Sequence, residues 1–259
     1  MPRELNNLIL SIFPGIDLLG RAFEEEGYCV VRGPDLLWGG DIRNFHPPVG
    51  IFGGVIGGPP CQIFSRLKYL NPLAGEKHGN LIPEFERIVV EAKPYWWLSE
   101  NVLEAPEPKV DGYFSQRIIL DNRWIGGVQQ RKRLFCFGCV DNKKLDIEVC
   151  LFEQLLILKT VTALGGLART KVKVGSSIRR GDLRSATVLA GHGPIGRGGQ
   201  KWTVTPPITE IAVLQGLPPD FLADAPFTTH GKRQVIGNAV PMPMGRAIAK
   251  AVKRALECR

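Results

Sequence analysis

The sequence lacks the features that mark membrane, secreted and disulfide-built proteins. No run reaches the roughly 18 apolar residues of a membrane span. Asn6, Asn7 and Asp17 interrupt the first apolar stretch, so we expect no secretory signal. The six cysteines are scattered, and a chain of 259 residues needs no disulfide framework, so reduced thiols are expected. We therefore expect a protein that stays in the compartment where it is made and spans no membrane.

The sequence also has little that would hold a metal or a dinucleotide. Its four histidines form no ligand cluster in the sequence. Cys136-x-x-Cys139 could suggest zinc, but no second pair has the right spacing, so no metal is expected. The G-x-G-x-x-G fingerprint is missing, so the glycine in Phe13–Asp17 is weak support for a dinucleotide site.

Positive charge is abundant and concentrated in one stretch. The formal net charge is +8, and residues 161–204 carry eight Lys or Arg against one acid, Asp182. The same stretch is rich in glycine, as in Gly191, Gly193 and Gly196. A basic balance of this size favours an anionic partner, either nucleic acid or an acidic membrane surface. The plainer alternative is a solvated surface insertion.

Hydrophobic patterning predicts an α/β fold. Short apolar runs bounded by Gly and Pro alternate with segments of helical spacing, which is typical of a doubly wound, mostly parallel sheet. We expect a catalytic domain over 1–140, completed by about 230–259, and a small, loop-rich basic domain over 141–229. The expected strands are 8–12, 28–31, 55–56, 95–98 and 133–140, and the expected helices are 18–26, 82–92 and 245–257.

Four segments carry residues suited to chemistry, although each has a bland alternative. Phe13–Asp17 follows the first strand, where a ligand can approach a helix N-terminus, but most such segments are plain turns. Cys61 follows two prolines at a strand end, where a thiolate can be favoured, or it is inert packing. Glu100 directly follows another strand as a potential general acid, or it is a helix cap or loop acid. Gln129, Arg131 and Arg133 share one face of an extended segment and suit a polar ligand, or they protect a strand edge.

The order of the motifs is more specific than any one of them. Phe-x-Gly, Pro-Cys-Gln, Glu-Asn-Val, Gln-x-Arg-x-Arg, Leu-Gln-Gly-x-Pro and Gly-Asn-x-Val follow one another from residue 8 to about 252, apart from the basic segment. This set resembles the C5-cytosine DNA methyltransferase family. The resemblance implies a Rossmann-like, S-adenosylmethionine-dependent fold with a target-recognition domain in the basic region.

The resemblance also implies a reaction. Cys61 matches the nucleophile that adds to C6 of a cytosine flipped out of the duplex. Glu100 matches the glutamate that contacts N3 and the exocyclic amine, and Arg131 matches the arginine at the cytosine O2. Gln129 and Arg133 belong to the same catalytic motif. The methyl group would come from S-adenosyl-L-methionine.

Two departures from the family pattern concern the cofactor. Asp17 replaces the usual second glycine of the first motif, which would put negative charge near the methionine end of the cofactor. The acid that holds the ribose has no clear match; Asp35 is the nearest candidate, and Trp38 would stack on adenine. The positions that match cofactor-lining residues are Phe13, Gly15, Ile16, Asp17, Asp35, Asp41, Ile42, Pro60, Leu81, Asn238 and Ala239.

The resemblance implies double-stranded DNA as partner, with Ser65, Arg179, Arg180 and Arg184 as candidate contacts. It suggests a monomer in the cytoplasm of a bacterial or phage-infected cell, linked in function but not physically to a cognate restriction endonuclease. Two alternatives stay open. One is methylation of tRNA, although the Cys-Phe-Thr motif of that branch is missing. The other is a DNA-binding relative without activity, which the departures at Asp17 and Asp35 would favour.

Overall fold

The computed structural model describes residues 6–60, 63–64, 79–149 and 207–257. The chain divides into two compact units. The first comprises Met1–Leu120, Lys132–Ile147 and Gly245–Arg259, and the second comprises Asp121–Arg131 and Glu148–Met244. These boundaries differ from those of the expected domains, because the segment before Lys132 and the segment before Gly245 both belong to the second unit.

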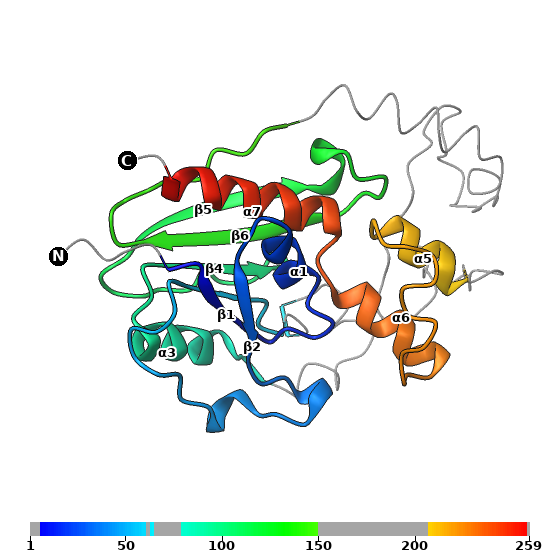
Figure 1. Cartoon of the computed structure of the whole chain (residues 1–259), viewed down its shortest axis with the longest axis horizontal. Coiled ribbons are helices and arrows are strands. Elements are labelled where there is room, and N and C mark those ends of the chain that lie inside the picture. Colours follow the sequence, from blue (N-terminus) through cyan, green and yellow to red (C-terminus); the bar gives the residue numbers. More distant parts are fainter. Residues whose placement is uncertain (1–5, 61–62, 65–78, 150–206, 258–259) are drawn as a thin grey trace. The chain divides into compact units, whose positions relative to one another are not determined.

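A six-stranded sheet forms the centre of the first unit, in the order β2-β1-β3-β4-β6-β5 (Figure 1). The pairs β1–β2, β1–β3 and β3–β4 are parallel, and β6 runs antiparallel to β4. This confirms the predicted α/β fold with a mostly parallel sheet. The strands are β1 (Leu8–Ile12), β2 (Cys29–Arg32), β3 (Gly54–Gly57), β4 (Trp96–Asn101), β5 (Phe114–Asp121) and β6 (Lys132–Cys139).

Two strands differ from the sequence-based expectation. Strand β5 was not predicted, because Ser115, Gln116 and Arg117 interrupt its apolar pattern and most of it is only partly covered. Strand β4 extends to Asn101, so that Glu100 lies inside the strand rather than after it. The backbone of Glu100 is therefore held by the antiparallel pairing with β6, where Phe135 is its partner.

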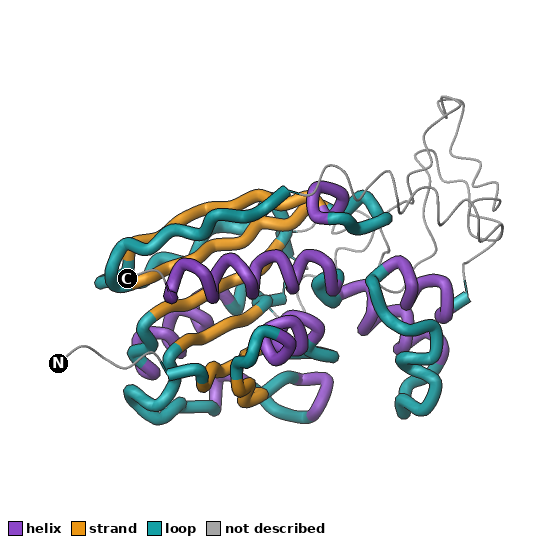
Figure 2. The backbone as a smooth tube through the Cα atoms, turned by 45° about the horizontal axis from the view of Figure 1, so that its top comes forward, coloured by secondary structure: helices purple, strands orange, loops and turns teal. Residues whose placement is uncertain are grey.

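Helices cover both faces of this sheet. Helix α3 (Ile82–Ala92) presents Phe85, Ile88 and Val89 to a core that includes alternate residues of β1. Helix α1 (Leu18–Glu25) covers the other face, where the Phe23 ring stacks on Trp96 at 5.6 Å between centroids. Helix α7 (Met242–Glu257) runs beside α1 from Gly245 onward (Figures 1 and 2).

Two tryptophans fill opposite faces of β4 because the neighbouring strands carry glycine. Gly54 is the register partner of Trp96, and Gly138 is that of Trp97. A Cβ atom at Gly54 would lie 2.3 Å from the Trp96 ring, and one at Gly138 would lie 2.1 Å from the Trp97 ring. Each indole therefore occupies the space that a side chain would take.

The second unit contains η4 (Asn122–Ile125), α5 (Ile208–Leu214) and α6 (Thr229–Asn238). Buried amide groups join these segments. Gln129 Nε2 donates to the Leu214 carbonyl at 2.9 Å and to Gln215 Oε1 at 3.0 Å, and Gln215 Nε2 donates to the Ile236 carbonyl at 2.8 Å. Within the described ranges, no helix is long and apolar enough to cross a membrane.

Candidate active site

The carboxyl group of Glu100 lies at the end of β4 in a buried, basic setting. The residue is 8% exposed, and its Oε1 is 2.8 Å from Nε of Arg133. Arg133 precedes Phe135, the register partner of Glu100, by two positions, so the two side chains share one face of the sheet. Gly58 completes the setting, because a Cβ there would lie 3.2 Å from Glu100 Oε2. The fold thus holds the Glu100 carboxylate and the Arg133 guanidinium together beside Gly58, the residue that follows β3.

The backbone that leads to Cys61 is attached to the same strand end. Asn101 Nδ2 donates to the Pro59 carbonyl at 3.2 Å, while its Oδ1 accepts from the Val102 amide at 2.9 Å. Pro60 is the last described residue before Cys61. Cys61 itself lies outside the described residues, as do Ser65, Arg179, Arg180 and Arg184.

The three polar residues of the Gln-x-Arg-x-Arg motif have different surroundings. Arg131 is 1% exposed, and its Nη2 donates to the carbonyls of Gly237 at 2.9 Å and Ala239 at 3.2 Å, all within the second unit. Gln129 is fully buried and donates to the segment that ends α5. Arg133, in the first unit, is the residue that pairs with Glu100. Gln129 and Arg131 therefore hold backbone carbonyls in place, whereas Arg133 forms the ion pair with Glu100.

The turn after β1 is built around three residues in the left-handed region. Phe13, Gly15 and Asp17 have φ values of 54°, 55° and 52°. Asp17 caps α1: its Oδ1 accepts from Ser11 Oγ at 2.8 Å and from the Gly20 amide at 3.0 Å. An asparagine or aspartate tolerates this conformation better than other side chains do. This capping role explains how Asp17 is accommodated at the position where the resembled family has glycine.

The charge of Asp17 is compensated inside the protein. Asp17 is 4% exposed, and its Oδ2 lies 2.8 Å from Nε of Arg32, the last residue of β2. Burial raises the pKa of Asp17, while the Ser11 hydrogen bond and the Arg32 charge oppose that rise. Sequence reasoning missed Arg32. The signal that could have found it was Asp17 itself, an acid at a position where the family has glycine. A buried charge requires a partner, so a basic residue nearby was to be expected.

Asp35 and Trp38 meet the same turn at Gly15. Asp35 Oδ2 accepts from the Gly15 amide at 2.9 Å, and Trp38 Nε1 donates to the Gly15 carbonyl at 2.8 Å. Asp35 also caps the short helix η1 (Leu36–Trp38) through the Leu37 amide at 2.7 Å. The structure thus brings Asp35 and Trp38 to Gly15, which precedes them by 20 and 23 positions in the sequence.

An open cavity of about 580 Å³ adjoins Asp35 and Trp38. Its lining combines apolar surface from β1 and β2 with the rings of Phe45 and Phe52 and the polar groups of Arg32 and Asp35. Cavities of this size, mostly apolar with few polar groups, are typical of ligand sites. Aromatic faces suit a nucleobase, a carboxylate suits ribose hydroxyls, and a Cβ at Gly15 would meet nothing within 4 Å. These residues fit a nucleoside cofactor.

The remaining candidate cofactor residues lie in several places. Asp41 caps η2 (Ile42–Asn44) and accepts from the Arg43 amide at 3.0 Å. Leu81 precedes α3 and belongs to the same core as Ile42. Ile16 is half-buried in the turn, and Asn238 and Ala239 end α6 in the second unit.

A metal site has no support in the described part of the chain, where no three His, Cys, Asp or Glu residues come together. Cys136 and Cys139 are both buried in β6. Burial raises the pKa of the Cys136 thiol to about 11, so it stays protonated at neutral pH. A protonated thiol is a poor zinc ligand.

Comparison with known proteins agrees with this geometry. A family model described as C-5 cytosine-specific DNA methylase matches residues 39–162. The Type II methyltransferase M.MthTI of Methanothermobacter thermautotrophicus is 26% identical, over 98% of this chain and 99% of its own. The Type II methyltransferase M.HindV of Haemophilus influenzae is also 26% identical, over 82% of this chain and 76% of its own.

A solved structure extends the likeness to the fold. The crystal structure of a DNA modification methyltransferase encoded within an E. coli prophage superposes with a TM-score of 0.62. It covers 96% of this chain and 99% of that one at 18% identity. The fold is that of the S-adenosylmethionine-dependent methyltransferases, and residues 39–162 match the family of C-5 cytosine-specific DNA methylases.

Proposed function

We propose that this protein is a DNA (cytosine-5-)-methyltransferase that acts on a cytosine within a specific duplex sequence. The observation that carries the proposal is the Glu100–Arg133 pair, set beside the Gly58–Pro60 segment that leads into Cys61. Similarity to the family supplies the reaction class, and this pair holds a carboxyl group in one orientation beside the backbone of Gly58 and Pro59, which precedes the candidate nucleophile.

In the proposed reaction the Cys61 thiolate adds to C6 of the cytosine, forming an S–C6 bond. The ring electrons that this releases make C5 nucleophilic, because the ring becomes enamine-like. Glu100 contacts N3 and the exocyclic amine. As a carboxylic acid it donates its proton to N3 when the addition moves negative charge onto that atom, and it becomes a carboxylate. Once C5 has formed its bond to the methyl group, loss of the C5 proton and breaking of the S–C6 bond restore the aromatic ring and release the Cys61 thiolate.

Arg133 takes the place near the cytosine that the resemblance assigned to Arg131. The reason is that Arg133 pairs with Glu100, whereas Arg131 donates to the Gly237 and Ala239 carbonyls. A guanidinium beside the carboxylate orients it through a charge-assisted contact. Arg131 is then a bracing residue.

S-adenosyl-L-methionine, when bound, supplies the electrophilic methyl group. We assign its nucleoside part to the cavity beside Asp35 and Trp38, whose aromatic and carboxylate groups suit adenine and ribose. Asp17 caps α1 below the turn, and Arg32 neutralises its charge. The negative charge at this family glycine is therefore no obstacle to the cofactor.

The basic segment 161–204 would supply the phosphate contacts that position the duplex. Two relatives are Type II methyltransferases by name, which favours a role beside a restriction endonuclease, in the cytoplasm, for this chain. We propose a functional link to such an endonuclease without physical association, and a monomeric enzyme.

The decisive experiment is bisulfite sequencing of a mixed-sequence duplex after incubation with the protein and S-adenosylmethionine. We expect protected cytosines in one recurring context. The matched control is Cys61→Ser, which should abolish protection while duplex binding survives. Protection that persists in Cys61→Ser would reject the mechanism. Methylation of tRNA in place of DNA, or duplex binding without methylation, would favour the two alternatives.

A further inference from the structure

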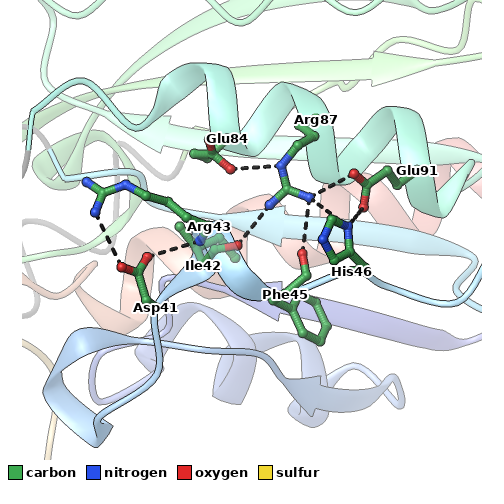
Figure 3. A network of polar contacts seen from close by, with 8 residues as sticks. All are labelled: Asp41, Ile42, Arg43, Phe45, His46, Glu84, Arg87 and Glu91. Atoms are coloured by element: carbon green, nitrogen blue, oxygen red, sulfur yellow. Dashed lines mark hydrogen bonds and ion pairs between the residues drawn. The ribbon is translucent and has the colours of Figure 1, made fainter.

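A charged residue behind the cavity wall holds two backbone carbonyls. Arg87 lies in the middle of α3, and its Nη2 donates to the Ile42 carbonyl at 2.8 Å while Nη1 donates to the Phe45 carbonyl at 3.1 Å (Figure 3). These carbonyls mark the beginning of η2 and the residue that caps its C-terminus. Arg87 thus holds both ends of this short helix through charge-assisted hydrogen bonds, which are stronger than neutral ones.

Two carboxylates fix the plane of this guanidinium. Glu84 Oε2 accepts from Arg87 Nε at 2.8 Å, and Glu91 Oε1 accepts from Nη1 at 2.8 Å. Glu84 precedes Arg87 by three residues and Glu91 follows it by four, so both stand on the same side of α3 (Figure 3). His46 Nδ1 contacts Glu91 Oε2 at 3.0 Å, which attaches the residue after Phe45 to the same helix.

The segment that Arg87 holds forms part of the cavity wall. The Phe45 ring lines the cavity, but Arg87 stands outside the lining. Ile42 is 3% exposed and packs in one core with residues of α3, and the preceding Asp41 caps η2. The packing of Ile42 in the core holds the 41–46 segment against α3. The guanidinium of Arg87 fixes the orientation of the Ile42 and Phe45 carbonyls in that segment.

We propose that Arg87 is a positioning residue for cofactor binding, which acts by holding the 41–46 segment in the conformation that forms this part of the cavity wall. This inference rests on the proposed use of S-adenosylmethionine. A loop that is already ordered spares the cofactor the entropy cost of ordering it. Only arginine can serve both carbonyls and both carboxylates, since lysine has no planar fork.

The test compares Arg87→Lys with the wild type and with Arg117→Lys. Arg117 is a matched control because it also pairs with a glutamate, Glu107 at 2.9 Å, and lies in β5 at the opposite edge of the sheet from β2. The dissociation constants of S-adenosylmethionine and S-adenosylhomocysteine are measured by calorimetry. Amide hydrogen exchange of residues 41–46 is measured without cofactor.

We expect Arg87→Lys to weaken both ligands about tenfold, the scale of one or two lost hydrogen bonds. Exchange across 41–46 should become faster, and kcat at saturating cofactor should stay within about twofold of wild type. Arg117→Lys should change none of these. Unchanged affinity in Arg87→Lys, or equal losses in both variants, would overturn the inference. A wild type that binds neither ligand would reject the proposed function, and the cofactor role of Arg87 with it.

Discussion

Two arginines of one motif, Arg131 and Arg133, have different roles because their surroundings differ. Arg131 and Arg133 are two positions apart in the sequence, yet one is buried against carbonyl groups and the other pairs with a carboxylate. The segment spacing indicated one shared face. The tertiary contacts decide that Arg131 donates to backbone carbonyls and that Arg133 pairs with Glu100.

This difference predicts that two matched substitutions affect different properties, the methyl-transfer rate in one case and the stability in the other. Arg133→Gln should lower the methyl-transfer rate at least about tenfold, because Glu100 loses its charged partner, with little change in thermal stability. Arg131→Gln should mainly destabilise, by about 1–3 kcal/mol, because it leaves buried carbonyls without a donor. Rates and urea unfolding curves of both variants check this. A stable, inactive Arg131→Gln with a fully active Arg133→Gln would reverse the assignment.

Asp17 makes a prediction about pH. Burial raises its pKa above the ordinary value of about 3.9, so the folded state binds the Asp17 proton more tightly than the unfolded state does. The stabilisation by this bound proton is complete below about pH 3.9 and is lost as the pH rises through the folded pKa.

The matching variant is Asp17→Asn, which keeps the cap to Gly20 but cannot titrate. The free energy of unfolding of the wild type, relative to the variant, should fall as the pH increases from about 3 to neutrality. Urea unfolding across that range measures the difference. A relative stability that rises with pH would show that the Arg32 pair, rather than burial, dominates.

At the scale of elements, the two faces of β4 depend on glycines in neighbouring strands. Trp97 is fully buried, and its ring has Gly138 as its register partner. Gly138→Ala should cost about 1–3 kcal/mol, because the added methyl group overpacks a filled core. Ser115→Ala, at an exposed position of β5, is the control and should change stability by less than about 0.5 kcal/mol. Equal unfolding midpoints for the two variants would contradict this packing.

The arrangement of elements also explains which strands could be predicted. Strands β1, β3 and β4 are covered on both faces and appear in the sequence as apolar runs. Strand β5 is mostly exposed or half-buried, so its sequence carries a weak signal. Helix α6 was also missed, because its residues are largely polar and only Val235, Ile236 and Gly237 are buried.

For the whole molecule, the charge distribution predicts how DNA binding responds to salt. Residues 161–204 carry a net charge of +7 within a chain of net charge +8. If this segment neutralises phosphates, log Kd rises with log salt by about 0.9 for each contact. The triple variant Arg179→Ala, Arg180→Ala, Arg184→Ala should reduce the slope by as much as about 2.7. Binding titrations from about 50 to 200 mM salt measure it. An unchanged slope would mean that these arginines face solvent.

The sequence by itself determined the class of sheet and the order of the chemical motifs. Alternating apolar runs and amphipathic segments suffice for the first, because buried parallel strands and their covering helices have distinct periodicities. The ordered motifs indicated the family through residues such as Cys61 and Glu100, since their chemistry depends on side-chain type.

The tertiary structure alone decided the partners. Arg133 meets Glu100 across an antiparallel pair, Asp17 meets Arg32 across the β1–β2 connection, and Arg87 reaches back some 45 residues to Ile42. Such pairs depend on strand register and on how a helix packs, and neither is contained in local spacing. A buried or half-buried charge can take any of several partners in the sequence. The packed core selects among them, and that selection shapes both the proposed active site and the cofactor cavity.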